Sequence, residues 1–308
     1  MIQKTTKHLD KLMKSSSALR RQFLVTPQEK ESTNRAVNDP LLEDSKYHKT
    51  QGLVHKYNNR VLIVPTLTCF AYCRFCTRKR KVDDLKYKLA PADIKKIVEY
   101  IKENKDINEA IISGGDPLTQ PKILIDLLNK LSKIDQIKII RIHTRAPVSQ
   151  PSAITPSIVK SLAKIKKQAV YVGIHFEHPD ELCKETLQAI VKLKKAGAIL
   201  FSQSVFLKDV NDDYKTLHSL FTQLSQNGVY PYMMSHCDLV KGAQHFIVPI
   251  EKEIQIMTLL RKSLSGIAFP VHVIDAPLGK GKVPVPQDFW QFNKNQFFDF
   301  DGKNIFMY

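Results

Sequence analysis

Three cysteines within eight residues constrain this chain more than any other feature of its sequence. Cys69, Cys73 and Cys76 follow the spacing CxxxCxxC, and the apolar run 61–64 precedes them. Such a run is typical of a buried strand, so we expect the thiols on a loop that leaves the end of a strand. Three thiolates can hold three irons of a four-iron cluster and leave the fourth iron open. We therefore predict a [4Fe–4S] cluster at these three cysteines.

Three other interpretations of the cysteines fit less well. A structural zinc site takes four ligands, usually from two paired motifs, and the sequence has no second pair. A disulfide framework suits a small secreted chain and would leave one thiol over. Three buried structural cysteines would explain neither the spacing nor the basic and aromatic residues around it. The remaining cysteines, Cys183 and Cys237, are expected to be free thiols.

Length and composition indicate one large α/β domain in a reducing compartment. The chain has 308 residues and 43% hydrophobic content, enough for a substantial core. Its low cysteine usage suits a reducing compartment. It has no run of about 18 apolar residues and no apolar signal-peptide core at the N-terminus. The acid-poor N-terminus could mimic a transit peptide, but Leu9, Leu12 and Leu19 more simply mark an amphipathic helix. We expect a cytoplasmic protein with no membrane partner.

The net charge of +17 raises nucleic acid as a partner. The lysines, however, are spread over many predicted helices and do not form one dense stripe. This distribution indicates solvated helix faces, and the charge also suits anionic cofactors. We therefore do not expect a nucleic-acid partner.

A strand–helix alternation begins at about residue 55. A helical pattern follows each of the first six predicted strands. Thr155 and Pro156 are expected to begin a helix, and Gly197 and Gly228 to follow helix ends. Successive βα units give a parallel sheet with crossover helices, but periodicity does not separate an open doubly wound sheet from a barrel. The predicted strands are 61–66, 109–113, 137–143, 170–175, 199–207, 230–235 and 271–275.

The cysteine motif resembles that of the radical S-adenosylmethionine (SAM) enzymes, and the stretch 73–80 resembles lysine 2,3-aminomutase more specifically. The resemblance covers roughly residues 50 to 300. It implies an α/β fold with a partial (βα)6 radical SAM barrel at 53–290, an N-terminal helical extension at 1–52 and a short C-terminal tail at 291–308. In such barrels the chemistry lies at the carboxyl ends of the strands.

The short length also resembles the relatives that make β-lysine for attachment to elongation factor P. The longer aminomutases have a C-terminal extension whose additional cysteines bind zinc and help tetramer assembly. This chain stops at Tyr308 without such cysteines. The resemblance therefore does not extend to the zinc site or to the tetramer, and whether the chain forms a homo-oligomer is left open.

The resemblance implies a SAM site after the second strand, at Ser113, Gly114, Gly115 and Asp116. Radical SAM enzymes bind the amino group of the methionine part with a glycine-rich segment at this place. Two glycines let the backbone approach a ligand closely.

Lys282 matches the family lysine that forms the Schiff base with pyridoxal phosphate (PLP). It lies in a glycine-rich turn after the last strand. Such a lysine must be partly deprotonated, and a glycine-rich turn lets it move. Lys280 is the alternative amine, although the spacing from Asp275 and the following Val-Pro favour Lys282. Further positions that match the surroundings of PLP in the family are Lys56, Arg60, His175 and Gln203.

Three residues match the family's substrate contacts. Arg78 corresponds to the arginine that binds the substrate carboxylate, for which a guanidinium fork is suited. Asp238 and Asp275 correspond to two aspartates that bind the ε-ammonium of lysine. One close pair of opposite charges is worth about 4 kcal/mol at an effective dielectric near 20, before desolvation is subtracted. Two acids would repel glutamate, so they favour a cationic amino acid.

The resemblance thus implies an isomerase, a radical SAM, PLP-dependent aminomutase that converts lysine to β-lysine through a 5′-deoxyadenosyl radical. A reductant such as flavodoxin or ferredoxin is implied as a partner. Alternatives are the same chemistry on arginine or ornithine, a radical SAM enzyme that modifies RNA, and a non-catalytic cluster protein that carries electrons or acts as a sensor.

Overall fold

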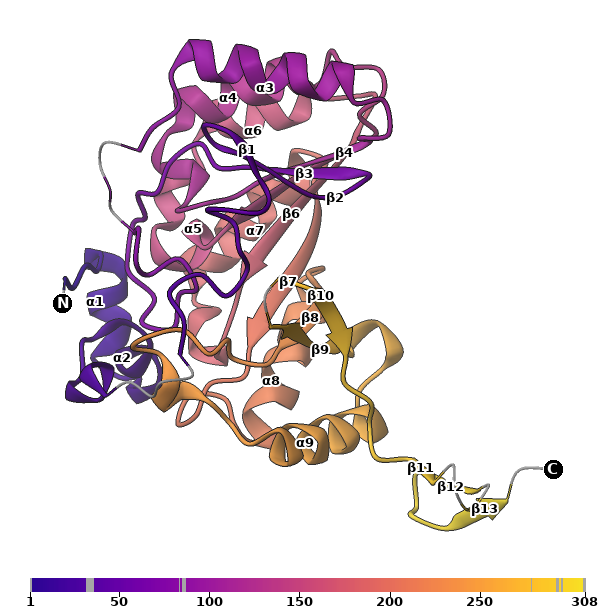
Figure 1. The fold of residues 1–308 in the computed structure, drawn as a ribbon. Helices are drawn as coiled ribbons and strands as arrows, with labels where there is room; N and C mark the ends of the chain where they lie inside the picture. The colour runs from indigo at the N-terminus through magenta and orange to yellow at the C-terminus, as the bar shows by residue number, and fades with distance from the viewer. Residues whose placement is uncertain are drawn as a thin grey trace.

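The computed structural model describes residues 2–31, 36–82, 84, 87–277, 279–291, 294 and 296–306. A ten-stranded sheet, hydrogen-bonded in chain order, forms its centre (Figure 1). Its strands are β1 (His48–Thr50), β2 (Leu53–Tyr57), β3 (Arg60–Ile63), β4 (Glu109–Ile112), β5 (Ile139–Thr144), β6 (Ala169–His175), β7 (Ile199–Val205), β8 (Tyr230–Ser235), β9 (Val271–Ala276) and β10 (Gly281–Pro284). The strands from β3 to β9 run parallel, and antiparallel pairs flank them at both edges.

A helix follows each of the first six parallel strands, as predicted. These helices are α3 (Pro91–Glu103), α4 (Pro121–Leu131), α6 (Pro156–Ala163), α7 (Lys184–Lys195), α8 (Tyr214–Gln226) and α9 (Ile250–Ser263). The boundary signals are confirmed as well. The hydroxyl of Thr155 accepts a hydrogen bond from the backbone N–H of Ile158, and Gly197 and Gly228 have the positive φ angles of +84° and +72°. The predicted α/β partial barrel is thus confirmed.

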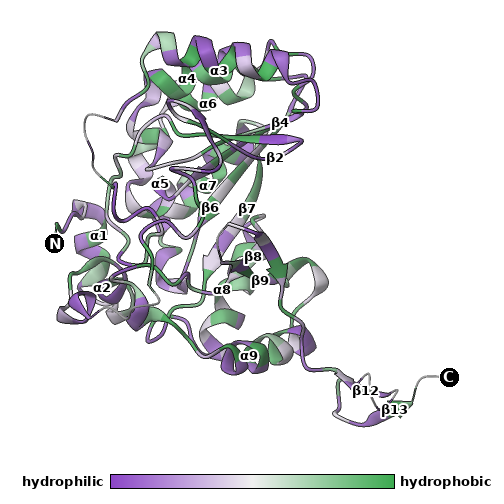
Figure 2. Cartoon of the chain, viewed as in Figure 1, coloured by the Kyte–Doolittle hydropathy of each residue, from purple (hydrophilic) through white to green (hydrophobic). Residues whose placement is uncertain are grey.

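The core lies between the strands and the inward faces of the helices. Figure 2 shows hydrophobic residues along the central strands and hydrophilic residues on the outer turns of α3. Ile140 of β5 and Leu124 and Leu128 of α4 are fully buried. Burying one such side chain stabilises the fold by about 1.5–3 kcal/mol. This packing fixes the positions of the strand ends, from which the candidate site is built.

The N-terminal segment packs against the cysteine loop. It contains α1 (Lys7–Met13) and α2 (Ser17–Phe23), which lie to one side of the sheet in Figure 1. The backbone N–H of Tyr72 donates to Lys4 O at 3.0 Å, and that of Arg74 donates to Gln22 O at 2.8 Å. The N-terminal segment therefore supports the loop that carries the cysteines.

A small second sheet follows the main one. It consists of β11 (Trp290–Gln291), β12 (Gln296–Phe298) and β13 (Asn304–Phe306), and it stands apart from the barrel in Figure 1. Residues 292, 293, 295, 307 and 308 of the predicted tail lie outside the described residues, as do residues 1 and 32–35 of the predicted N-terminal extension. The predicted boundaries at 52/53 and 290/291 stay predictions. No helix among the described residues is long and apolar enough to cross a membrane.

Candidate active site

The cysteine loop leaves the carboxyl end of β3. Cys69, Cys73 and Cys76 are free, half-buried thiols. Burial raises the pKa of each thiol. The charges of the neighbouring cysteines also raise the pKa of Cys69 and Cys76, and together these effects bring the pKa of Cys76 to about 11. The three sulfur atoms are therefore close enough to repel one another as thiolates. Bound metal would supply the positive charge that stabilises the thiolates.

A four-iron cluster and a single metal ion make different demands on the three cysteines. Among the described residues, no group of three His, Cys, Asp or Glu side chains converges as the ligands of one metal ion would. A four-iron cluster places each thiolate on a different iron, so the sulfur atoms need not meet at one point. Phe75, which belongs to the cysteine loop, packs in a small hydrophobic core with Leu207, Cys237 and Phe246.

The glycine turn after β4 packs directly against the stem of the cysteine loop. Backbone N–H groups of Gly115 and Asp116 donate to Thr66 O and Thr68 O, both at 2.8 Å. A Cβ atom on Gly115 would lie 2.4 Å from Thr68 O, and Gly114 has φ +118°. Both positions therefore require glycine for this contact, whether or not a ligand is bound.

Asp116 is buried behind the same turn. Its carboxylate accepts hydrogen bonds from the hydroxyl of Thr144 at 2.8 and 2.9 Å and from the backbone N–H groups of Leu118 and Arg145. Burial raises its pKa, and these hydrogen bonds oppose the shift. Ser113 precedes the turn and donates its N–H to Ile63 O at 2.9 Å. Asp116 thus holds the turn in place through protein donors.

Asp238, Asp275 and Lys282 come together at the far edge of the sheet. Lys282 of β10 lies opposite Asp275 of β9, and the distance from Lys282 Nζ to Asp275 Oδ2 is 2.5 Å. Asp238 follows β8. Burial and the charge of Asp275 raise the pKa of Asp238 to about 6, while Lys282 and His236 act in the opposite direction. Lys280 is exposed on the preceding turn.

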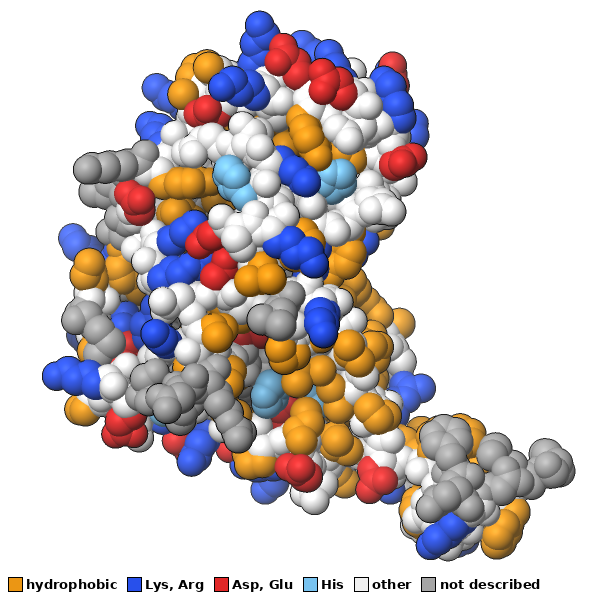
Figure 3. Space-filling model, viewed as in Figure 1, with side chains coloured by type: hydrophobic (Ala, Val, Ile, Leu, Met, Phe, Trp, Pro, Cys, Tyr) orange, Lys and Arg blue, Asp and Glu red, His pale blue; other side chains and the backbone are white. Residues whose placement is uncertain are grey.

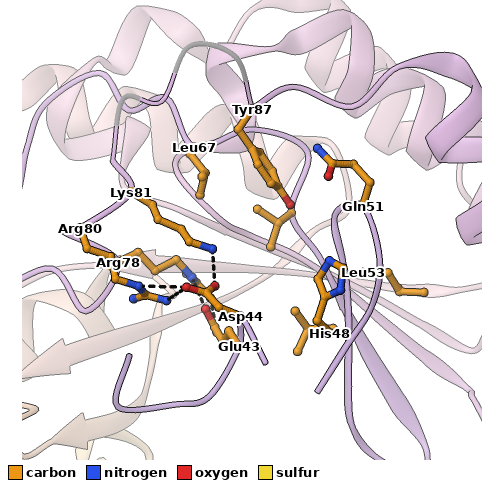
Figure 4. Close-up of a pocket in the computed structure, with 12 residues that line it drawn as sticks. Glu43, Asp44, His48, Gln51, Leu53, Leu67, Arg78, Arg80, Lys81 and Tyr87 are labelled. Carbon is orange, nitrogen blue, oxygen red and sulfur yellow. Dashed lines mark hydrogen bonds and ion pairs between the residues drawn. The ribbon is translucent and has the colours of Figure 1, made fainter. Parts of the chain in front are cut away.

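Arg78 forms an ion pair that the sequence did not indicate. Its Nε and Nη2 atoms each donate to one carboxylate oxygen of Glu43 at 2.7 Å, and its Nη1 atom donates to Gly114 O at 3.2 Å. The Arg78 guanidinium holds the pKa of Glu43 below its ordinary value despite burial. Figure 4 shows this pair beside Asp44, which binds Arg80. These four charged side chains line part of a cavity of about 240 Å³.

Gln203 and His175 lie side by side on β7 and β6, paired in register. Gln203 Oε1 accepts a hydrogen bond from His143 Nδ1 at 2.7 Å. Burial, with Arg141 and His175 nearby, lowers the pKa of His143 to about 3, so this ring is neutral. Its other nitrogen, Nε2, is buried and has no hydrogen-bond partner among the described residues. Sequence reasoning missed His143, although its position near the end of a strand was a usable signal.

Lys56 and Arg60 are connected to the Lys282 turn by two tyrosines. The Arg60 guanidinium lies 3.9 Å from the Tyr57 ring centroid, and Lys56 Nζ lies 5.3 Å from the same centroid. The hydroxyl of Tyr47, whose ring Lys56 also approaches, donates to Gly279 O at 3.2 Å. The tyrosine roles were not predicted, because they depend on the approach of the two sheet edges.

Comparison with known proteins gives one consistent result. The family model of the radical SAM superfamily matches residues 63–220. An L-lysine 2,3-aminomutase from Methanococcus maripaludis is 38% identical over 82% of this chain and 58% of its own length. A putative L-lysine 2,3-aminomutase from Aquifex aeolicus is 36% identical over 82% of this chain and 68% of its own. A glutamate 2,3-aminomutase from Clostridioides difficile is 34% identical over 80% of this chain and 58% of its own length.

Several of the most similar relatives are longer than the matched region, and the chain spans about three fifths of their length. Among solved structures, a radical SAM methyltransferase from Sphaerobacter thermophilus has a TM-score of 0.54 at 13% identity, covering 72% of this chain and 68% of that chain. This likeness concerns the fold alone. The chain therefore belongs to the radical SAM superfamily and, within it, to the lysine 2,3-aminomutase family.

Proposed function

We propose that this protein is a radical SAM, PLP-dependent aminomutase that converts L-lysine to β-lysine. The observation that carries the proposal is the meeting of Asp238 and Asp275 beside Lys282. The raised pKa of Asp238 reflects burial and repulsion between the two carboxylates, and a substrate ammonium between them would relieve that repulsion. A cationic side chain is therefore the chemistry that this pair recognises.

The superfamily's cofactors are a [4Fe–4S] cluster and SAM, and PLP is expected for the lysine 2,3-aminomutases. We assign Cys69, Cys73 and Cys76 to the cluster. The turn of Ser113, Gly114 and Gly115, supported by Asp116, is assigned to SAM. When bound, the cluster and SAM supply the radical, and PLP supplies the π-system through which nitrogen migrates. The chain itself fixes the relative positions of these groups and excludes water from them.

The PLP assignment rests on two groups of polar side chains. Lys56 and Arg60 supply cations for a phosphate, and the tyrosine contacts link them to the Lys282 turn. The buried, unpartnered Nε2 atom of His143 lies beside Gln203 and His175, and it fits a position against a bound ligand. A neutral His143 would meet such a ligand without adding charge.

Arg78 is assigned to the substrate carboxylate. In the structure its fork holds the carboxylate of Glu43 with two equal contacts of 2.7 Å. This is the geometry in which an arginine binds a carboxylate of any source. Substrate binding at Arg78 therefore requires Glu43 to give up this ion pair.

The alternative substrates and the RNA-modifying alternative would place different charges against these residues. A glutamate substrate would place its side-chain carboxylate against Asp238 and Asp275, whereas arginine or ornithine would meet them with a cation. An RNA-modifying enzyme would need a docking face. On the face shown in Figure 3, Lys and Arg lie scattered over the edges and the middle and are mixed with acids. Neither the acid pair nor the charge distribution favours RNA.

The experiment is a substrate panel. Reconstituted protein is incubated anaerobically with dithionite, SAM, PLP and one of lysine, arginine, ornithine or glutamate, and the β-amino acid is measured by mass spectrometry. We expect the highest kcat/KM with lysine. The double variant Asp238→Asn, Asp275→Asn should reduce the kcat/KM for lysine by at least two orders of magnitude. Turnover of glutamate, or full lysine turnover by the double variant, would overturn the substrate assignment.

A further inference from the structure

A buried arginine outside the predicted site contacts one of the cysteines. Arg145 follows β5 at the same end of the sheet as the cysteine loop and is 8% exposed. Its Nη1 atom donates to Cys73 Sγ at 2.8 Å. A charged donor this close to a sulfur atom is a strong interaction, because little solvent screens it at this depth.

Acidic and amide side chains hold the guanidinium from the other side. Its Nη2 atom donates to Glu181 Oε1 at 2.8 Å and also to the side-chain oxygen of Gln22 on α2. Glu181 is fully buried, and its second oxygen accepts the backbone N–H of Glu177 at 2.8 Å. The guanidinium therefore contacts the Cys73 sulfur and the Glu181 carboxylate through different nitrogen atoms, both at 2.8 Å.

Aromatic rings fix the plane of the same group. The Arg145 guanidinium carbon lies 4.6 Å from the centroid of Phe23 and 5.4 Å from that of Phe75. Phe23 ends α2, and Phe75 belongs to the cysteine loop. Cation–π contacts of desolvated groups reach about 2 kcal/mol. The backbone N–H of Arg145 is held as well, by Asp116 Oδ2 at 2.9 Å. The donor cannot turn away from Cys73 without breaking these contacts.

We propose that Arg145 is a positioning residue for the iron–sulfur cluster, which fixes the orientation of the Cys73 side chain and raises the reduction potential of the cluster held there. The inference rests on the proposed assignment of Cys73 as a cluster ligand. Hydrogen bonds to the ligand sulfurs and the net charge around a cluster set its potential. A buried positive group at the sulfur favours the reduced cluster, which carries one more negative charge. Glu181 limits this effect while it holds the arginine in place.

The test compares midpoint potentials in the full-length protein. Parent, Arg145→Gln, Arg145→Lys and Glu181→Gln are reconstituted anaerobically, their iron and sulfide contents are measured, and each is titrated reductively with detection of the reduced cluster by electron paramagnetic resonance. Arg145→Gln should shift the midpoint to more negative values. Arg145→Lys should shift it less, because it keeps the charge and loses the fork. Glu181→Gln should shift it to more positive values, because a buried negative charge is removed.

Controls separate the outcomes. Arg21→Gln, on α2 with its guanidinium directed to Asp209 at 3.4 Å, should leave the midpoint unchanged. Parent potentials in Arg145 variants that keep the parent's iron content would overturn the inference. If those variants fail to fold, an unchanged potential in Glu181→Gln would overturn it. Failure of the underlying assignment looks different, since the parent itself would then bind no cluster, or Cys73→Ala would retain the parent's spectrum.

Discussion

Among the individual residues, Asp238 tells most about the substrate. Its charge depends on Asp275 and Lys282, which lie close to it. Burial and Asp275 raise the pKa of Asp238 to about 6, and Lys282 only partly offsets this. The two carboxylates therefore repel each other when both are ionised, even with Lys282 beside Asp275. A cationic substrate stabilises both carboxylates at once, which links the local electrostatics to the choice of substrate.

The raised pKa predicts a pH-dependent penalty on stability. The unfolded chain releases this proton near pH 4, whereas the folded protein retains it up to about pH 6. The free energy of unfolding should therefore fall as the pH rises through this window. Asp238→Asn removes the penalty, so its stability relative to the parent should grow by about 1.4 kcal/mol from pH 5 to pH 8, because about one pKa unit of the shift lies above pH 5.

Urea unfolding of the cluster-free protein at both pH values measures this difference. Asp126→Asn on α4, where the carboxylate is exposed beside Lys130, serves as the matched control and should show no such trend. A pH-independent difference between the parent and Asp238→Asn would contradict the account.

Gly115 gives a second prediction at the level of one residue. The Cβ atom of Gly115→Ala would lie 2.4 Å from Thr68 O, a backbone atom that moves only with the cysteine loop. We expect a loss of about 1–3 kcal/mol in unfolding free energy and a lower iron content after reconstitution. Gly197→Ala is the control, because its Cβ meets nothing within 4 Å and only its φ of +84° is unfavourable. Equal iron content and stability in Gly115→Ala and the parent would refute the packing argument.

Among the elements, the segment before β1 is joined to the residues after the cysteine motif by two ion pairs. Its Glu43 occupies the Arg78 fork, and its Asp44 binds Arg80 (Figure 4). If Arg78 binds the substrate carboxylate, Glu43 competes with the substrate for the same donors. The segment is thus an internal ligand of the site as well as a part of its wall.

Glu43→Gln should therefore lower the KM for lysine. Removing a competing charged hydrogen bond is worth about 1.4 kcal/mol, which corresponds to about a tenfold lower KM. Arg78→Lys is the matched variant, and it should raise KM because it loses the bidentate contact. Steady-state kinetics of the reconstituted enzymes decide between the outcomes. A KM in Glu43→Gln equal to or above that of the parent would show that Glu43 does not compete.

A comparison of the helices and strands with the sequence shows which of them could be predicted. Strands β3 to β9 were predicted within a few residues, because strands buried on both faces are continuous apolar runs between helical periods. The edge strands β1, β2 and β10 were not predicted, since they are short and partly exposed, and β10 also contains a glycine and a proline. Partners such as Glu43 for Arg78, or Arg145 for Cys73, lie 35 and 72 residues apart in the chain. No local pattern encodes contacts of that range.

In the molecule as a whole, the parallel strands bring residues that are distant in the sequence to one end of the sheet, while helices such as α3 and α7 carry exposed lysines. Figure 3 shows basic side chains scattered over the edges and the middle of the face in view, interspersed with acids. On this face the net charge of +17 is thus not concentrated as a nucleic-acid docking surface requires. The charge distribution and the enclosed acid pair favour a small substrate over a polymer.

We therefore expect no saturable binding of transfer RNA at 150 mM salt. Fluorescence anisotropy across a salt series measures this directly. Micromolar binding with a steep linear dependence of log affinity on log salt would indicate several phosphate contacts and would support the RNA-modifying alternative.

The central claim joins the cluster, the acid pair and Lys282 in one reaction, and one measurement tests it most directly. Parent protein, Lys282→Ala and Lys280→Ala are reconstituted anaerobically and incubated with dithionite, SAM, PLP and L-lysine, and β-lysine and 5′-deoxyadenosine are measured by mass spectrometry. We predict β-lysine from the parent and from Lys280→Ala, and none from Lys282→Ala. Formation of 5′-deoxyadenosine by the parent without any β-lysine would contradict the proposed reaction, and β-lysine from Lys282→Ala would contradict the role of that lysine.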